Sequence, residues 1–254
     1  MAKHPYILAE AHYRDIKQAR YEVAILPWGA TEAHNYHLPY GTDNFEADAF
    51  AREAARIASD RGARVIVLPT IPFGVNTTQL DINLTINMNP STQMSVLHDI
   101  ASSLERHGVP KLMILNSHGG NDFKQMIREL HTRHTIFLCA VNWFRSLDLV
   151  KYFDAPGDHA DEMETSVMMH IAPRVVLPLS EAGDGAQRRL KITGFREGWA
   201  WTPRQWTEVT SDTGTGNPKA ATPEKGKKYF EDVTAKLTQF IVELDAADLN
   251  DLYE

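Results

Sequence analysis

Residues 23–43 read VAILPWGATEAHNYHLPYGTD, an apolar run followed at once by a polar loop. The run at 23–26 is typical of a buried strand, and Pro27 and Gly29 are expected to end it. The polar residues would then lie on the loop at the carboxyl end of that strand. Ligands of open α/β sheets bind outside the carboxyl ends of the strands, so we expect a functional site in this loop.

This loop carries three side chains that suit a divalent metal ion, namely Glu32, His34 and Asp43. In extended chain, Glu32 and His34 point the same way because side chains alternate. Asp43 returns toward them after a turn at Pro39 and Gly41, and it is the candidate for a carboxylate that bridges two metals. Short Glu-x-His patterns also occur by chance, so a polar loop whose histidine only caps or hydrogen-bonds remains an alternative.

Composition is that of an ordinary globular protein, with 254 residues, 43% hydrophobic and 23% charged, and it fits a single domain over 1–254. The net charge of -7 argues against a nucleic-acid partner. No run approaches the roughly 20 apolar residues of a membrane span, and residues 1–5 lack an apolar signal region. We therefore expect a cytoplasmic protein with no membrane partner.

The single cysteine, Cys139, lies in the apolar run 136–141. Its expected role is core packing rather than nucleophilic attack. No disulfide is possible within the chain, which fits a reducing compartment.

Apolar runs and amphipathic segments alternate along the chain, which predicts an α/β fold built from parallel crossover units. The predicted strands are 23–26, 65–68, 111–115 and 136–141, with a further short strand near 84–88. The predicted helices are a short one within 7–20, then 45–58, 90–107, 122–134, 158–171 and 223–244.

A second histidine-bearing turn follows the third predicted strand, just as the first polar loop follows the first predicted strand. The sequence NSHGGN at 116–121 comes directly after that apolar run. Because the carboxyl ends of parallel strands meet at one edge of a sheet, His118 shares this edge with Glu32 and His34. A metal ligand is therefore favoured over a buried, hydrogen-bonded histidine.

A third polar group opens the helix expected over 158–171 and contains His159, Glu162 and Glu164. Acidic residues in a first helical turn are stabilised by the helix dipole, and this is a sufficient account of Glu162. The helix dipole does not explain why a third group of histidine and acidic residues would lie at the same end of the sheet as the first two.

Two aromatic features have a structural and a functional interpretation. Trp199, Trp201 and Trp206 lie in an irregular stretch, where core packing is favoured over an interface or a pocket wall. Trp143, at the end of the fourth predicted strand, is expected to fill the core. The polar loop at 70–90 could line a substrate pocket or be an ordinary solvated connection.

Taken together, these motifs resemble the creatininase (creatinine amidohydrolase) family. The matching segments, in order, are GATEAH at 29–34, LPYGTD at 38–43, NSHGGN at 116–121, HADEMETS at 159–166, GTGNP at 214–218 and ATPEKG at 221–226. The resemblance implies a three-layer α/β/α sandwich with a mostly parallel central sheet, a small-molecule amide substrate and a homo-oligomer, commonly a hexamer built from dimers. It also implies a hydrolase acting on cyclic amides or related C–N bonds other than peptide bonds.

The resemblance also implies roles for six residues. The positions that match metal ligands are Glu32, His34, Asp43, His118 and Glu164. Asp43 would bridge two divalent ions, with zinc preferred and manganese or iron(II) second. Water activated by these ions would attack the amide, and His159, matching the catalytic histidine, would deliver a proton to the leaving nitrogen. Glu164 is counted with the catalytic residues as well. Each histidine ligand should donate its other ring N–H to a second acceptor.

Two positions depart from the family pattern. Members that act on creatinine can carry a glutamate two residues after the histidine matched by His118, and here that residue is Gly120, which places more weight on Glu164. Residues 76–79 read NTTQ where many members have a Ser-x-Glu-His type of sequence. A formamide hydrolase, a peptide-trimming enzyme on the same scaffold and a non-catalytic metal-binding homologue are therefore the alternatives, although the intact ligand set argues against the last.

Overall fold

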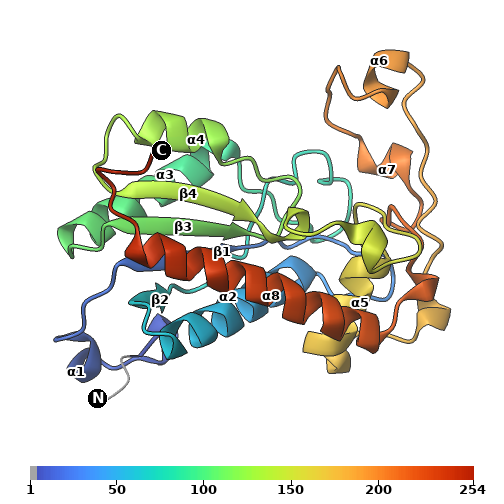
Figure 1. The fold of residues 1–254 in the computed structure, drawn as a ribbon. Helices are drawn as coiled ribbons and strands as arrows, with labels where there is room; N and C mark the ends of the chain where they lie inside the picture. Colours follow the sequence, from blue (N-terminus) through green and yellow to red (C-terminus); the bar gives the residue numbers. More distant parts are fainter. Residues whose placement is uncertain (1–4) are drawn as a thin grey trace.

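The computed structural model describes residues 5–254, and across them one parallel sheet of four strands runs through the molecule (Figure 1). The strand order is β2-β1-β3-β4. The strands are β1 (Val23–Trp28), β2 (Val65–Val67), β3 (Lys111–Asn116) and β4 (Phe137–Asn142). Residues 1–4 lie outside the described residues, and so does most of the segment 1–5, which is predicted to lack a signal region.

Helices cover both faces of this sheet, so the three predicted α/β/α layers are confirmed (Figure 1). Successive side chains of a strand point to opposite faces, so Val23 and Ile25 pack in one core and Ala24 and Leu26 in the other. The helices of the first core are α2 (Thr42–Asp60), α5 (Glu162–Ile171) and α8 (Pro223–Ala246). Those of the second are α3 (Pro90–Arg106) and α4 (Lys124–Leu130).

Helix α5 is held against α8 by close backbone packing and by an ion pair. A Cβ atom on Gly226 would lie 1.8 Å from the Ser166 carbonyl oxygen, so only glycine fits there. Lys225 Nζ lies 2.5 Å from the buried carboxylate of Glu162. Glu162 therefore has a structural role, while Glu164 on the same helix stays available to the site.

Strand β1 continues through Pro27 to Trp28, so the prediction that it ends at Pro27 is wrong. The Pro27 carbonyl accepts from the Ile71 amide, on the side of β2. Because β2 has already ended at Val67, the missing N–H of Pro27 faces a region without a strand partner.

Other boundaries also differ from the predictions. The short strand predicted near 84–88 is only an isolated bridge between Thr31 and Ile86. Helix α4 covers half of the predicted 122–134, and α5 begins at Glu162 because the preceding Asp161 caps it through the Met163 and Glu164 amides.

The predictions for two core residues are confirmed. Cys139 packs against the first core, and burial raises the pKa of its thiol to about 12, which leaves it a poor nucleophile. Trp143 is buried and donates from Nε1 to Ser117 Oγ at 2.9 Å.

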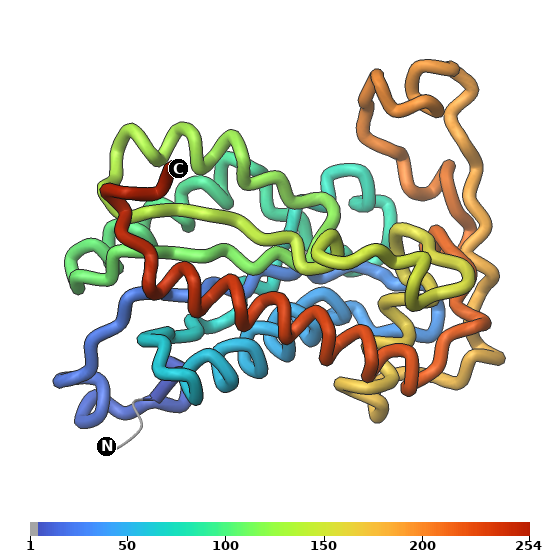
Figure 2. Tube along the Cα trace, in the orientation of Figure 1, coloured from blue at the N-terminus to red at the C-terminus, as the bar shows by residue number. Residues whose placement is uncertain are grey.

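Residues 186–206 form a projection that we call the arm, which stands away from the sheet and its helices (Figures 1 and 2). It includes α6 (Thr193–Arg196) and ends at α7 (Trp206–Val209). Trp199 and Trp201 are 77% and 84% exposed, so the prediction that they pack in the core is wrong.

Short helices complete the chain. They are η1 (Leu8–Glu10), α1 (Tyr13–Ile16), η2 (Trp143–Arg145), η3 (Leu149–Lys151), η4 (Pro173–Val175), η5 (Leu179–Glu181) and η6 (Pro218–Ala220). None of the helices described has the length and apolar character that crossing a membrane requires.

Candidate metal centre

The predicted site residues meet at the carboxyl ends of β1 and β3, the two central strands. From β1 the chain passes to β2 on one side and then to β3 on the other, which makes this the switch point where α/β folds bind ligands. Glu32 and His34 follow β1, and His118 follows β3. Asp43 lies in the first turn of α2 rather than on a loop, and Glu164 lies in the first turn of α5.

Asp43 stands between two histidines, with one carboxylate oxygen toward each. Its Oδ1 lies 3.2 Å from His34 Nε2, and its Oδ2 lies 3.0 Å from His118 Nδ1. Glu32 Oε1 also lies 2.9 Å from His118 Nδ1. Within the described residues, these atoms belong to groups of three that could each hold a metal ion, namely Glu32–Asp43–His118 and His34–Asp43–Glu164. Asp43 is thus common to both groups.

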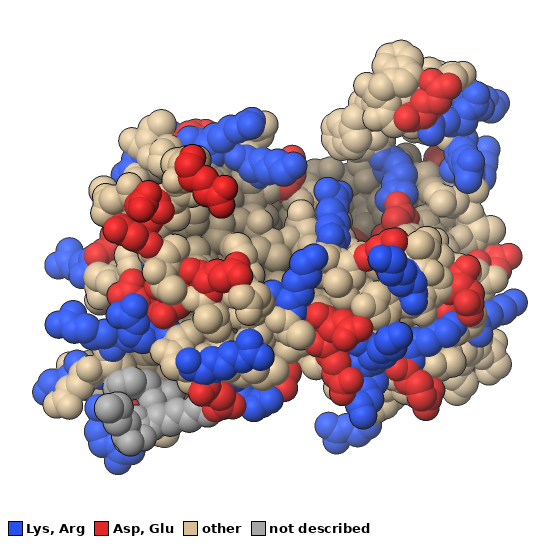
Figure 3. Space-filling model, viewed as in Figure 1, with Lys and Arg blue, Asp and Glu red and all other residues tan. Residues whose placement is uncertain are grey.

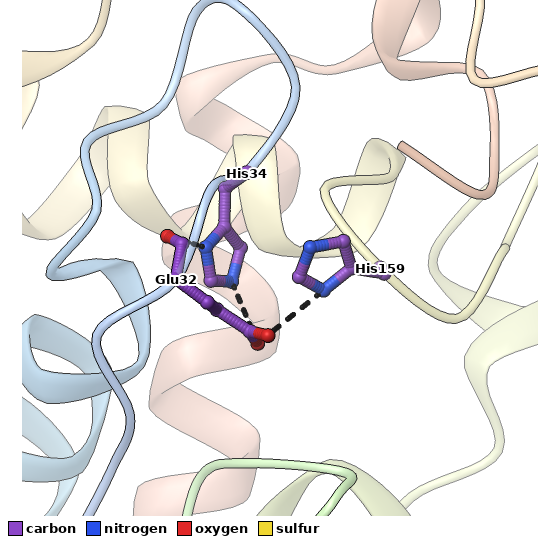
Figure 4. A group of neighbouring side chains, drawn as sticks. All are labelled: Glu32, His34 and His159. Atoms are coloured by element: carbon purple, nitrogen blue, oxygen red, sulfur yellow. Dashed lines mark hydrogen bonds and ion pairs between the residues drawn. The ribbon is translucent and has the colours of Figure 1, made fainter. Parts of the chain in front are cut away.

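A third group of possible ligands brings in His159, which precedes α5. His159 and His34 lie with their ring centroids 4.2 Å apart, and His159 Nδ1 lies 3.8 Å from Glu32 Oε1. Figure 4 shows both rings directing a nitrogen toward the Glu32 carboxylate. His159 Nδ1 therefore faces the Glu32 carboxylate, and this side chain can serve as a metal ligand or as a proton carrier.

Each of the three histidines is oriented by a backbone carbonyl, as expected for metal-binding imidazoles. The acceptors are the carbonyls of Glu32 for His34 Nδ1 at 3.1 Å, Val75 for His118 Nε2 at 3.1 Å and Ala33 for His159 Nε2 at 2.9 Å. In every case, the other ring nitrogen faces the carboxylates.

Four buried carboxylates surround these rings, and one of them was not predicted. Glu46 lies three residues after Asp43 on the same face of α2, so helical spacing could have identified it. Burial raises the pKa of Glu46 well above its ordinary value, and Glu164 raises it further. Burial, then Asp161 and Asp43, raise the pKa of Glu164 in the same way.

This donor set fits divalent cations. Buried carboxylates in this density are costly unless positive charge compensates them. Glu46 Oε1 is buried and accepts no hydrogen bond in the part of the chain that the structure describes, and the buried Glu32 Oε1 and Asp43 Oδ2 share one close neighbour, His118 Nδ1. The mixed carboxylate and imidazole donors suit zinc, manganese or iron(II).

The NTTQ segment at 76–79 lies against the candidate ligands, so the pocket interpretation of this loop has structural support. Gln79 is buried, and its side-chain amide donates to the Glu32 carboxylate. The Trp206 amide donates to the Thr78 carbonyl at 3.2 Å, and the Trp206 ring meets the His159 ring edge-on at 4.8 Å. Gln79 and Trp206 thus border the site from two segments whose roles the sequence left open.

Gly120→Ala is expected to weaken metal binding at least about tenfold, because it displaces a candidate ligand from its acceptor. A Cβ atom there would lie 2.4 Å from the Val75 oxygen and 2.5 Å from His118 Nε2. These two atoms form the hydrogen bond that orients the His118 ring. The neighbouring Gly119 has open space at its Cβ position, so Gly119→Ala is the matched control. Zinc titration of both variants checks this, and unchanged affinity in Gly120→Ala would contradict it.

Metal uptake is expected to release protons, so metal affinity should rise as the pH rises from 7 to about 9. Burial alone would lower the pKa of His34, but Asp43 and Glu32 raise it to about 9. The same carboxylates raise the pKa of His118 well above its ordinary value against the effect of burial. Below these pKa values a metal must displace a proton, at a cost of about tenfold in affinity per proton and pH unit.

Calorimetric zinc titrations in buffers of different ionisation enthalpy measure the number of protons released. An affinity that is the same at pH 7 and pH 9 would show that the two imidazoles are not protonated in the metal-free protein, or that they do not bind the metal.

Comparison with known sequences relates this site to a family. The sequence pattern described as creatininase, creatinine amidohydrolase, matches residues 9–241. A mycofactocin precursor peptide peptidase of Mycobacterium ulcerans is 27% identical over 218 residues, which cover 82% of this chain and 80% of that protein. A creatinine amidohydrolase of Pseudomonas putida is 29% identical over 104 residues, which cover 39% of this chain and 38% of that protein.

Solved structures agree with this assignment. A proposed creatinine amidohydrolase from Bacteroides fragilis superimposes with a TM-score of 0.92 at 45% identity, covering 100% of both chains. A creatininase variant of the Zn-Zn type has a TM-score of 0.77 at 18% identity, covering 95% of this chain and 99% of that chain, and so shares the fold. Because the family pattern spans most of the sequence, the chain belongs to the creatininase family.

Proposed function

We propose that this protein is a metal-dependent hydrolase that cleaves an amide C–N bond at a binuclear centre bridged by Asp43. The observation that carries the proposal is the position of Asp43, whose two oxygens face His34 and His118 on opposite sides. A structural ion pair needs only one of these contacts. Two metal groups that share a single buried carboxylate suit a site that holds two cations side by side.

The residues of each group supply the ligands. Glu32, Asp43 and His118 would hold one ion, and His34, Asp43 and Glu164 the other. When bound, such ions lower the pKa of water and polarise a carbonyl group. Zinc is our first choice and manganese the second, since creatininases of the family fold have been solved with each, and iron(II) suits the same donors.

His159 is the group that we assign to proton transfer. Burial and the neighbouring His34 hold the pKa of His159 below its ordinary value, so the ring is neutral at pH 7. Its Nε2–H donates to the Ala33 carbonyl, which leaves the Nδ1 lone pair facing the centre. Nδ1 can take a proton from attacking water and pass it to the leaving nitrogen. Trp206 packs against the His159 ring, and both side chains are buried.

A linear, peptide-type amide is the substrate class that we favour. Relatives named mycofactocin precursor peptide peptidase align over about four-fifths of the chain, whereas the Pseudomonas putida creatinine amidohydrolase aligns over 39%. Gly120 also stands where creatinine-acting members can carry a glutamate. A cyclic amide is the second candidate, because the Bacteroides fragilis protein, at 45% identity, is a proposed creatinine amidohydrolase.

Chelation and reconstitution test the proposal. The purified protein is stripped of metal, reloaded with zinc or manganese, and assayed on creatinine, an N-formyl amine and short peptides. We expect hydrolysis of at least one compound that disappears on chelation and returns with metal. The proposal fails if the reloaded protein hydrolyses none of them, or if hydrolysis survives complete metal removal.

A further inference from the structure

We propose that an arginine-lined cavity in the arm binds a carboxylate carried by the amide substrate, an inference that rests on the proposed function. The cavity has a volume of about 330 Å³, which is within the range of small-molecule sites. Its walls include four guanidinium groups and two apolar side chains. These residues are Arg188, Arg189, Arg196, Arg204, Leu190 and Phe195.

The arm carries a net positive charge, whereas the whole chain carries a net negative charge. Residues 186–206 contain five lysine and arginine residues and one glutamate, in a chain whose net charge is -7. Figure 3 shows basic side chains beside the hollow between the arm and the body. Cations gathered in one segment repel one another, and together they attract an anionic group.

Two of the four guanidinium groups have no carboxylate partner among residues 5–254. Arg204 pairs with Asp158 at 2.8 Å, and Arg188 lies 3.5 Å from the exposed carboxylate of Glu208. The described contacts give Arg196 only the Thr193 hydroxyl, and they give Arg189 no side-chain partner. The cavity therefore keeps unpaired positive charge that a ligand can neutralise.

Arg204, which lines the cavity, connects it to the metal centre through Trp206. The guanidinium of Arg204 lies over the Trp206 ring, 4.9 Å from its centroid. The same ring meets His159 at 4.8 Å, and Asp158, the partner of Arg204, is adjacent to His159 in sequence. We infer that a substrate whose amide lies at His159 extends along Trp206 toward Arg204 and the cavity.

A carboxylate is the anion that best fits this arrangement. A guanidinium group binds a carboxylate through two parallel N–H···O bonds, and arginine is the residue favoured for such planar recognition. Leu190 and Phe195 offer apolar surface to the atoms that join the carboxylate to the amide. The cavity thus selects amides with an acidic end, such as a peptide with a free C-terminus.

Binding of hippurate and hippuramide, which differ only in carboxylate against carboxamide, tests this inference by calorimetry. Both compounds are titrated into zinc-loaded and metal-free protein. We expect hippurate to bind at least about tenfold more tightly in both forms. In the R189Q/R196Q variant this preference should fall below about threefold, while hippuramide affinity stays unchanged. The K191Q/K219Q variant removes the same charge at exposed sites outside the cavity and should keep the preference.

Four results would overturn the inference. They are an equal loss of preference in both double variants, a preference that survives in R189Q/R196Q, a preference that exists only in the zinc-loaded form, and no measurable hippurate binding. Inorganic phosphate that binds more tightly than hippurate with the same arginine dependence would instead assign the cavity to a free anion. This experiment measures binding and not hydrolysis. Its result can therefore be interpreted even if the proposed hydrolytic function is wrong.

Discussion

The Asp43→Asn variant is expected to retain fewer than about one metal ion per chain, where the wild type retains about two, and to lose hydrolysis by a factor of about a thousand or more. The reason is geometric. Each carboxylate oxygen of Asp43 faces a different histidine, and an asparagine replaces one of the oxygens with an NH₂ group that cannot bind a cation. Elemental analysis and kcat/KM on the substrate identified by the reconstitution assay measure the two effects.

Asp48→Asn is the matched control for this variant. Asp48 lies on the same helix, is partly exposed and pairs with Arg52 at 2.7 Å on the surface. Both metals and full activity are expected there, because an exposed ion pair contributes little. A fully metallated and active Asp43→Asn variant would contradict the assignment of Asp43 as the bridge.

Gly226→Ala is expected to lower the free energy of unfolding by about 3 kcal/mol or more, which lowers Tm by about 6 °C or more. Alanine inside a helix would by itself stabilise by up to about 1 kcal/mol. The added Cβ would lie 1.8 Å from the Ser166 carbonyl oxygen and 2.9 Å from the Val167 amide nitrogen, so α5 and α8 must separate. This clash of backbone with backbone outweighs the gain in helix propensity.

Thermal unfolding followed by circular dichroism measures the Gly226→Ala effect. Gly119→Ala, where the new Cβ meets open space, should change Tm by less than about 2 °C. A Gly226→Ala protein as stable as the wild type would mean that α5 and α8 are not packed as described, and the placement of Glu164 would then be in doubt.

The fold and most of the site were predictable because the signals are local. Buried parallel strands read as apolar runs, and parallel strands bring their carboxyl ends to one edge, so Glu32, His34 and His118 were expected to lie together. Asp43 was expected on a loop because it follows a turn at Pro39 and Gly41. Tertiary packing instead extends α2 back to Thr42 and buries Asp43 in its first turn.

Features set by long-range packing could not be predicted in this way. Glu46 shares a helix face with Asp43, but its complete burial depends on the packing around α2, which the sequence does not show. Trp199 and Trp201 are as apolar as core residues, and only the tertiary structure reveals that the arm carries them away from the body. Glu164 lies on a helix more than a hundred residues after Asp43, so its place in the site was expected from the resemblance to the family and not from spacing.

Anomalous diffraction from crystals grown with zinc is the most direct test of the binuclear centre. We predict two strong peaks on either side of the Asp43 carboxylate, one beside Glu32 and His118 and the other beside His34 and Glu164. A single peak, or peaks that leave Asp43 without a metal on each side, would contradict the central claim that one buried carboxylate joins two metal ions.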